Sequence, residues 1–153
     1  MKLPTVLRIP DSASMRALGR DLAAQAQVGD LFVLTGTLGA GKTTLVQGMA
    51  QGLGVGEWIT SPTFVLMRSY RTDRGIDLVH VDAYRLRSGE EVDDLDIDIG
   101  ASITAVEWGE QAAPRLADRW VGISIQADEA VADLRHVTIR EVTRTEALSA
   151  EMS

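Results

Sequence analysis

A glycine-rich run at residues 36–43, Gly-Thr-Leu-Gly-Ala-Gly-Lys-Thr, constrains this chain more than any other feature. It fits the pattern G-x-x-x-x-G-K-[ST], in which a curled backbone turns its N–H groups inward around phosphate oxygens. Lys42 would neutralise the outer phosphates, and the Thr43 hydroxyl can bind Mg²⁺. The run therefore predicts a P-loop, the phosphate-binding part of a nucleoside triphosphate site.

The residues on either side of this run support the prediction. Residues 31–34 are apolar and partly β-branched, as expected of a buried strand that ends at the loop. After the run, Leu45, Met49 and Leu53 lie at helical spacing, and Gly54 can end the helix. Strand, loop and helix thus follow in the order that a P-loop needs, and the positive end of the helix dipole would face the anion.

Composition limits the classes of protein to which the chain can belong. Its 153 residues suit one domain, residues 1–153, with a single hydrophobic core. It contains no cysteine and no apolar stretch long enough to span a membrane, so we expect a soluble, cytoplasmic protein without a membrane partner. A net charge of −7 disfavours nonspecific binding to nucleic acid, so any link to RNA is expected to run through a partner.

The periodicity of apolar residues predicts the remaining elements. We expect strands at 5–9, 64–70, 76–81 and 103–106, helices from residue 12 and at 111–117, and a closing antiparallel pair at 120–126 and 134–142. From about residue 145 the chain reads as a polar tail. The predicted fold is α/β: a single P-loop NTPase-like domain whose mixed sheet has a parallel core and antiparallel edge strands, with helices on both faces.

An acidic stretch at residues 90–98 has two interpretations. Its crowded aspartates could hold a cation, but the stretch lacks the glycine and the terminal glutamate of a calcium loop. Charge runs are usually solvated, so we favour an exposed acidic helix that a partner could contact.

Two further carboxylates follow apolar runs. Asp82 ends the predicted strand at 76–81, and Glu107 ends the strand at 103–106. If both strands run parallel to the P-loop strand, Asp82 and Glu107 emerge at the same sheet edge as Thr43, where a P-loop fold holds or orients Mg²⁺. A third cluster, Ser61-Pro62-Thr63-Phe64, places a turn and a small hydroxyl just before a strand.

Taken in order, residues 36–44, 61–64, 80–86 and the pair Glu107-Trp108 resemble the TsaE family, and the similarity covers most of the chain from about residue 10 to residue 142. The resemblance implies ATP and Mg²⁺ as cofactors and a slow ATPase. It also implies docking on the TsaB and TsaD proteins, which place threonylcarbamoyl on adenosine 37 of tRNAs that read codons beginning with adenine. The chain departs from the family pattern at Thr37, Gly109 and Met15, but none of these removes a group that the phosphate chemistry requires.

The resemblance also assigns roles to residues. Thr43 and Glu107 are the implied metal ligands, and Thr63 senses the outer phosphate. Asp82 orients water, holds a water bound to the metal, or binds the metal directly. Asp82 could instead cap a helix, and Thr63 could be a plain turn residue. The implied nucleotide-binding residues are Leu38, Gly39, Ala40, Gly41, Lys42, Thr43, Thr44 and, near the adenine, Arg135.

Three nearby side chains have less definite roles. His80 lies within a strand and is expected to be structural. Trp108 either stacks on a ligand or partner or belongs to the core. Arg85 either lies on the surface or stabilises charge in the transition state.

Two other functions fit the same motifs. A small-molecule kinase also needs a P-loop, Mg²⁺ and carboxylates, but it needs an acceptor pocket and usually a lid as well. A nucleotide-controlled adaptor would use ATP to set its affinity for a partner, with little turnover. A GTPase is disfavoured because the chain contains no asparagine and so cannot present an Asn-Lys-x-Asp motif.

Overall fold

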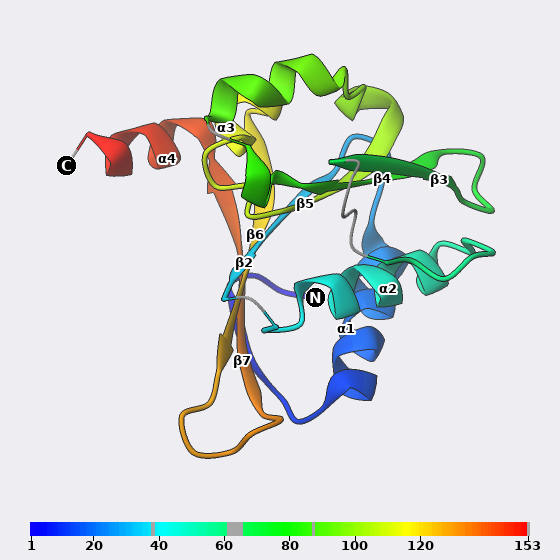
Figure 1. The fold of residues 1–153 in the computed structure, drawn as a ribbon, viewed down its shortest axis with the longest axis vertical. Helices are drawn as coiled ribbons and strands as arrows, with labels where there is room; N and C mark the ends of the chain where they lie inside the picture. The colour runs from blue at the N-terminus through cyan, green and yellow to red at the C-terminus, as the bar shows by residue number, and fades with distance from the viewer. Residues whose placement is uncertain (38, 61–65, 87, 153) are drawn as a thin grey trace.

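A seven-stranded mixed sheet organises the molecule, in the order β1-β7-β6-β2-β5-β4-β3 (Figure 1). The computed structural model describes residues 1–37, 39–60, 66–86 and 88–152. The strands are β1 (Thr5–Ile9), β2 (Leu31–Gly36), β3 (Met67–Arg71), β4 (Asp77–Asp82), β5 (Ser102–Glu107), β6 (Arg119–Ala127) and β7 (Arg135–Thr143).

The centre of this sheet is parallel and its edges are antiparallel, which confirms the prediction. Strand β2 pairs in parallel with β5 and β6, and β5 pairs in parallel with β4. The pairs β3–β4, β6–β7 and β1–β7 are antiparallel. All six residues of β5 are buried, as expected of a strand covered on both faces.

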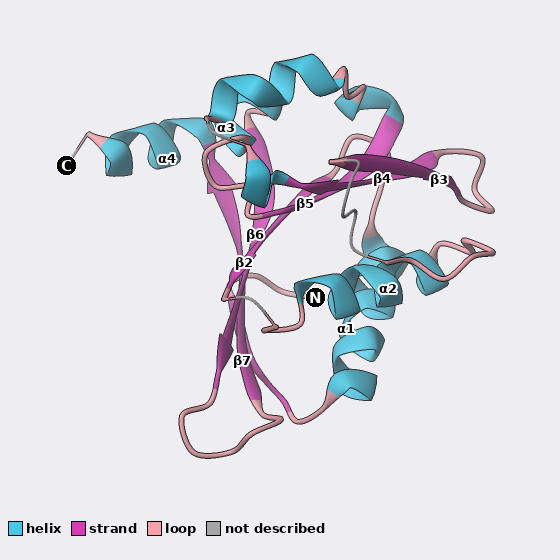
Figure 2. Cartoon of the chain, viewed as in Figure 1, coloured by secondary structure: helices cyan, strands magenta, loops and turns pink. Residues whose placement is uncertain are grey.

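Helices cover both faces of the sheet (Figure 2). Helices α1 (Ser12–Gln25) and α2 (Lys42–Gly52) pack on one face. The other face carries α3 (Ala113–Leu116), α4 (Arg144–Glu151) and the 3₁₀ helices η1 (Ala83–Arg85), η2 (Gly89–Leu95) and η3 (Ile99–Ala101). Strand β2 shows why two core layers form: Phe32 and Leu34 point to the α1/α2 side, and Leu31 and Val33 to the opposite side.

Helices α1 and α2 approach each other closely through small residues. A Cβ atom added at Gly48 of α2 would lie 2.1 Å from the carbonyl oxygen of Arg16 in α1. A Cβ at Gly19 of α1 would lie 2.3 Å from the carbonyl oxygen of Leu45 in α2. Since these neighbours are backbone atoms, only glycine permits this helix spacing.

Two segments differ in detail from what the sequence predicted. The expected polar tail forms helix α4, because the Thr143 side chain accepts a hydrogen bond from the Glu146 amide and Arg140 pairs with Glu146 at 2.6 Å. The acidic stretch at residues 90–98 forms only the short 3₁₀ helix η2; Asp96 after it adopts a left-handed conformation, and η3 begins beyond the stretch. The first residues of the strand expected at 64–70 lie outside the described residues, and β3 begins at Met67.

Within the described ranges, no helix combines the length and the apolar character needed to cross a membrane.

Gly48→Ala should force α1 and α2 apart. The added methyl group would meet backbone atoms of Arg16 that cannot rotate away. We expect the free energy of unfolding to fall by about 1–3 kcal/mol, the usual cost of overpacking, measured by urea denaturation.

Gly56→Ala is the matched control, because a Cβ there meets no atom within 4 Å. Its stability should change by less than about 0.5 kcal/mol. Equal stability of the two variants would contradict the close packing of α1 against α2.

Candidate functional site

The glycine-rich loop connects the end of β2 to the start of α2. Gly41 precedes α2 with a φ of 116°, a left-handed conformation that favours glycine. Gly41 has no side chain to cap the first turn of α2, so the amide N–H groups there receive no hydrogen bond from the capping residue and can bind another acceptor. A helix of 11 residues with an uncapped start at a glycine-rich turn is suited to binding an anion.

Lys42 is almost completely buried at the start of α2. Only 4% of its surface is exposed, and its ammonium group donates hydrogen bonds to the carbonyl oxygens of Gly36 (2.7 Å) and Thr37 (2.8 Å). The same nitrogen lies 4.1 Å from the centre of the Trp108 ring. Burial lowers the pKa of Lys42, and the carboxylates of Glu107 and Asp82 oppose this change. The loop thus holds a cation directed toward its own interior.

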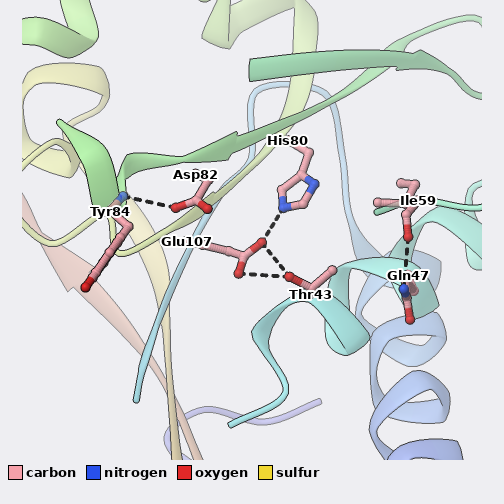
Figure 3. A network of polar contacts seen from close by, with 7 residues as sticks. All are labelled: Thr43, Gln47, Ile59, His80, Asp82, Tyr84 and Glu107. Carbon is pink, nitrogen blue, oxygen red and sulfur yellow. Dashed lines mark hydrogen bonds and ion pairs between the residues drawn. The ribbon is translucent and has the colours of Figure 1, made fainter. Parts of the chain in front are cut away.

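Glu107 joins α2 to the end of β5. Its two carboxylate oxygens lie 3.1 and 3.0 Å from the hydroxyl of Thr43, which donates to them (Figure 3). One of these oxygens also lies 2.5 Å from Nε2 of His80 on β4. Glu107 is 4% exposed, so its charge sits in a largely dry environment with two hydrogen-bonding neighbours.

Asp82 lies beside Glu107 at the end of β4. The two residues are paired in the register of the parallel strands, as the sequence predicted. Asp82 accepts a hydrogen bond from the Tyr84 amide at 3.0 Å and so caps η1, while it also lines the same cavity as Lys42. Asp82 therefore caps a helix and also lines the candidate site.

Two adjoining hollows flank the glycine-rich loop. One, of about 300 Å³, is lined by loop residues together with Lys42, Thr43, Asp82, Glu107 and Trp108. The other, of about 370 Å³, is lined by the start of α1, by the loop and by Asp133 and Arg135 near the start of β7. Gly39, Gly41 and Thr44 line both, so the two hollows meet across the loop.

Arg135 connects β7 to the glycine-rich loop. Its Nε donates to the carbonyl oxygen of Ala40 at 3.0 Å. The preceding hairpin loop is fixed by Asp128, which accepts hydrogen bonds from the amides of Ala130 and Val131 and pairs with His136 at 2.8 Å. These bonds, that to His136 above all, lower the pKa of Asp128 to about 2. Arg135 is thus held at the second hollow, and its predicted place near an adenine stays a prediction.

The oxygen atoms of Thr43 and Glu107 suit a small divalent cation. Two oxygens bound to Mg²⁺ at about 2.1 Å in adjacent octahedral positions are about 3.0 Å apart. The observed separations of 3.0 and 3.1 Å match this spacing. Within the described ranges no three or more His, Asp or Glu side chains gather into a metal-binding group, at this site or at any other, so phosphate oxygens and water would complete the coordination.

These observations can be set beside known proteins. Residues 9–137 match the model of one family, described as "Threonylcarbamoyl adenosine biosynthesis protein TsaE". That range includes every side chain of the site, from Asp11 to Arg135. The chain belongs to the TsaE family. The resemblance found in the sequence motifs is confirmed.

Relatives of this TsaE chain are similar over most of its length. The TsaE protein of Streptomyces coelicolor is 48% identical over 133 residues, which are 82% of this chain and 88% of the relative. The Bacillus subtilis TsaE is 37% identical over 142 residues, 90% of this chain and 87% of the relative. The crystal structure of YdiB from Bacillus subtilis superimposes with a TM-score of 0.70 at 29% identity, covering 99% of this chain and 96% of that one.

The structure brings most of the predicted TsaE site together. Gly39, Ala40, Gly41, Lys42, Thr43, Thr44, Asp82, Glu107 and Arg135 all line the two hollows or contact residues that do. Leu38 and Thr63 lie outside the described residues. Their roles stay predictions, as do the ligands assigned to the others.

Two side chains have a closer relation to the site than the sequence indicated. His80 contacts Glu107 directly, and its position two residues before Asp82 on one strand face was the available signal. Trp108 is neither simply core nor exposed: it lies over Lys42 and packs at 5.0 Å against the exposed ring of Tyr84. Its backbone φ of 60°, unusual for a large residue, turns the ring toward the loop and could not be read from sequence.

The titration of Asp128 should report the order of the hairpin loop beside Arg135. Because its folded pKa lies below the ordinary value of 3.8, its stabilising contribution is complete above about pH 4 and is lost as the pH falls toward 2. Carbon-13 NMR of the carboxyl group should give a midpoint near 2. His136→Ala should raise that midpoint toward 3.8, and an unchanged midpoint would show that His136 does not hold the loop.

Proposed function

We propose that this TsaE chain binds ATP with Mg²⁺ and hydrolyses it slowly, in support of threonylcarbamoyl modification of tRNA. The observation that carries the proposal is the contact of Thr43, at the start of α2, with Glu107, at the end of β5, beside the buried Lys42. A phosphate-binding turn, a cation and an oxygen pair spaced for Mg²⁺ lie together in one hollow. This combination is what phosphoryl transfer requires.

The proposed roles follow from these positions. The backbone N–H groups of the P-loop cradle the phosphates, and Lys42 neutralises the outer ones. Thr43 and Glu107 hold Mg²⁺, which would supply neutralisation of the charge that develops on the phosphate oxygens. Asp82, beside Glu107 and facing the same hollow, orients the attacking water. The second hollow, which Arg135 lines, is proposed to hold the adenine.

The energy of hydrolysis is proposed to serve a complex of the TsaB and TsaD proteins. The net charge of −7 repels the tRNA backbone, so tRNA is reached only through that complex. The relatives are named for the biosynthesis of threonylcarbamoyladenosine in tRNA, and this chain is similar to them over most of its length.

Lys42→Met should abolish nucleotide binding. The ammonium group would no longer offset the phosphate charge, and losing about 3 kcal/mol of charge-assisted hydrogen bonding weakens affinity at least about a hundredfold. Fluorescence titration with a labelled ATP measures the effect. Lys2→Met is the matched control, since Lys2 is the other lysine of the chain and is exposed. Wild-type affinity in Lys42→Met would contradict the phosphate site.

Glu107→Ala should separate binding from hydrolysis. Without Mg²⁺ the affinity for ATP should stay within about threefold of wild type, because the lysine and the backbone remain. With Mg²⁺ the hydrolysis rate should fall at least about a hundredfold, in line with losing a group that stabilises developing charge. Normal hydrolysis by Glu107→Ala, measured by phosphate release, would overturn the metal assignment.

The molecule that stimulates hydrolysis or accepts phosphate distinguishes the ATPase from the two alternative functions, the kinase and the adaptor. The ATPase rate should be measured for the chain alone, with small-molecule acceptors, and with TsaB, TsaD and tRNA. Stimulation only by the protein partners supports the proposal. Phosphate on a small acceptor would instead identify a kinase, and nucleotide-dependent binding to the partners without turnover would identify an adaptor.

A further inference from the structure

His80 is a fully buried histidine that contacts a proposed metal ligand. Its exposed fraction is 0%, and its Nε2 lies 2.5 Å from one carboxylate oxygen of Glu107 (Figure 3). A carboxylate can only accept a hydrogen bond, so the Nε2–H of His80 is the donor. The other ring nitrogen, Nδ1, is buried without a hydrogen-bond partner among the described residues. Glu107 is therefore the polar neighbour that accounts for the presence of a histidine here.

The neighbours of His80 along β4 and on β5 include buried apolar residues, and its partner on β3 is the exposed Arg68. Leu78, two residues earlier on the same face of β4, and Ala105, its partner on β5, are both 0% exposed. A purely structural role at such a position would be filled by an aliphatic side chain, which leaves no buried polar atom unsatisfied. The polar ring costs stability at this position, and among the described residues its hydrogen-bond partner is Glu107.

The contact fixes one oxygen of Glu107. The Thr43 hydroxyl and the His80 N–H approach the carboxylate from α2 and from β4, on two different elements. A carboxylate with only one neighbour could rotate about its side-chain bonds, whereas two donors on separate elements restrict it. Partners that hydrogen-bond to a ligating carboxylate or histidine commonly set the orientation of the ligand and change metal affinity by about 10- to 100-fold.

We propose that His80 is a positioning residue: it donates Nε2–H to Glu107 and presents the carboxylate to the Mg²⁺ that accompanies bound nucleotide. This inference rests on the proposed function, because it assumes that Glu107 binds the metal. It assigns His80 no proton transfer and no contact with nucleotide. Its effect should therefore appear in the coupling between metal and nucleotide and not in nucleotide binding itself.

The test measures that coupling directly. The affinity for a non-hydrolysable ATP analogue is determined by calorimetry with saturating Mg²⁺ and again with a chelator, and the ratio of the two affinities is the contribution of the metal. His80→Leu removes the donor while keeping an apolar side chain of similar size. It should lower the ratio about tenfold and leave the affinity in chelator within about twofold.

Two further variants keep the test decisive. His80→Gln carries an amide N–H near the position of Nε2 and should restore most of the ratio. His136→Leu removes the pair with Asp128, which lies beside Arg135 of the second hollow and away from Glu107, so any change in nucleotide affinity should be the same with Mg²⁺ and with chelator and the ratio should stay unchanged. In a Glu107→Gln background, His80→Leu should have no further effect on the ratio, since the group that it positions has been altered.

The outcomes distinguish this inference from the function on which it rests. If wild-type binding does not depend on Mg²⁺, the proposed metal site fails. If wild type shows the coupling and His80→Leu keeps it, the positioning role is overturned. The role is overturned equally if His80→Leu and His80→Gln lose affinity in chelator and in Mg²⁺ to the same extent, because that result reports damage to the fold.

Discussion

The parallel pairing of β2, β5 and β4 is the constraint on which the site depends. The ladder places Leu34 opposite Glu107, and Glu107 opposite Asp82, so three strands end at one edge of the sheet. Each backbone bond of the ladder fixes the register, and a slip of one residue would turn Glu107 and Asp82 to the other face. The glycine-rich loop leaves β2 at that edge. The positions of its lysine and of both carboxylates are therefore consequences of strand pairing.

The charges buried at this sheet edge need polar partners, and neighbouring groups provide them. Lys42 and Glu107 are each 4% exposed, and a buried charge without partners would be strongly unfavourable. Lys42 is solvated by two carbonyl oxygens and the face of Trp108, and Glu107 by a hydroxyl and an imidazole. Such a network is rigid because every member depends on the others for its hydrogen bonds. The site is thus preorganised by the same contacts that make its burial possible.

The sequence predicted the parts of this arrangement that local pattern controls. Alternation and apolar runs located the strands, and the glycine-rich run that ends in Lys42 located the loop between β2 and α2. The meeting of Thr43 with Glu107, 64 positions apart in the chain, followed only from assuming that β5 runs parallel to β2. That assumption was correct. The same assumption, applied to β4, predicted that Asp82 lies beside Glu107.

What the sequence did not predict depends on tertiary contact or on backbone conformation. The partner of His80 comes from another strand, and the orientation of Trp108 follows from a left-handed backbone that a non-glycine residue rarely adopts. Helix α4 was missed because only Ala147, Leu148 and Ala150 of its eight residues are apolar and none of its residues is buried, so no wide apolar stripe marks it. Its start depends instead on a cap and on ion pairs with β7 and with the loop before β6.

The glycine contact between α1 and α2 has a consequence for the shape of the whole cleft. Met15 of α1 lines the hollow on one side of the loop, and Lys42 of α2 lines the hollow on the other. Because backbone packs directly on backbone at Gly19 and Gly48, no side chain at this crossing can be compressed or rearranged. The distance between the two hollows is therefore fixed by the helix pair. It limits the size of a molecule that can occupy both hollows at once.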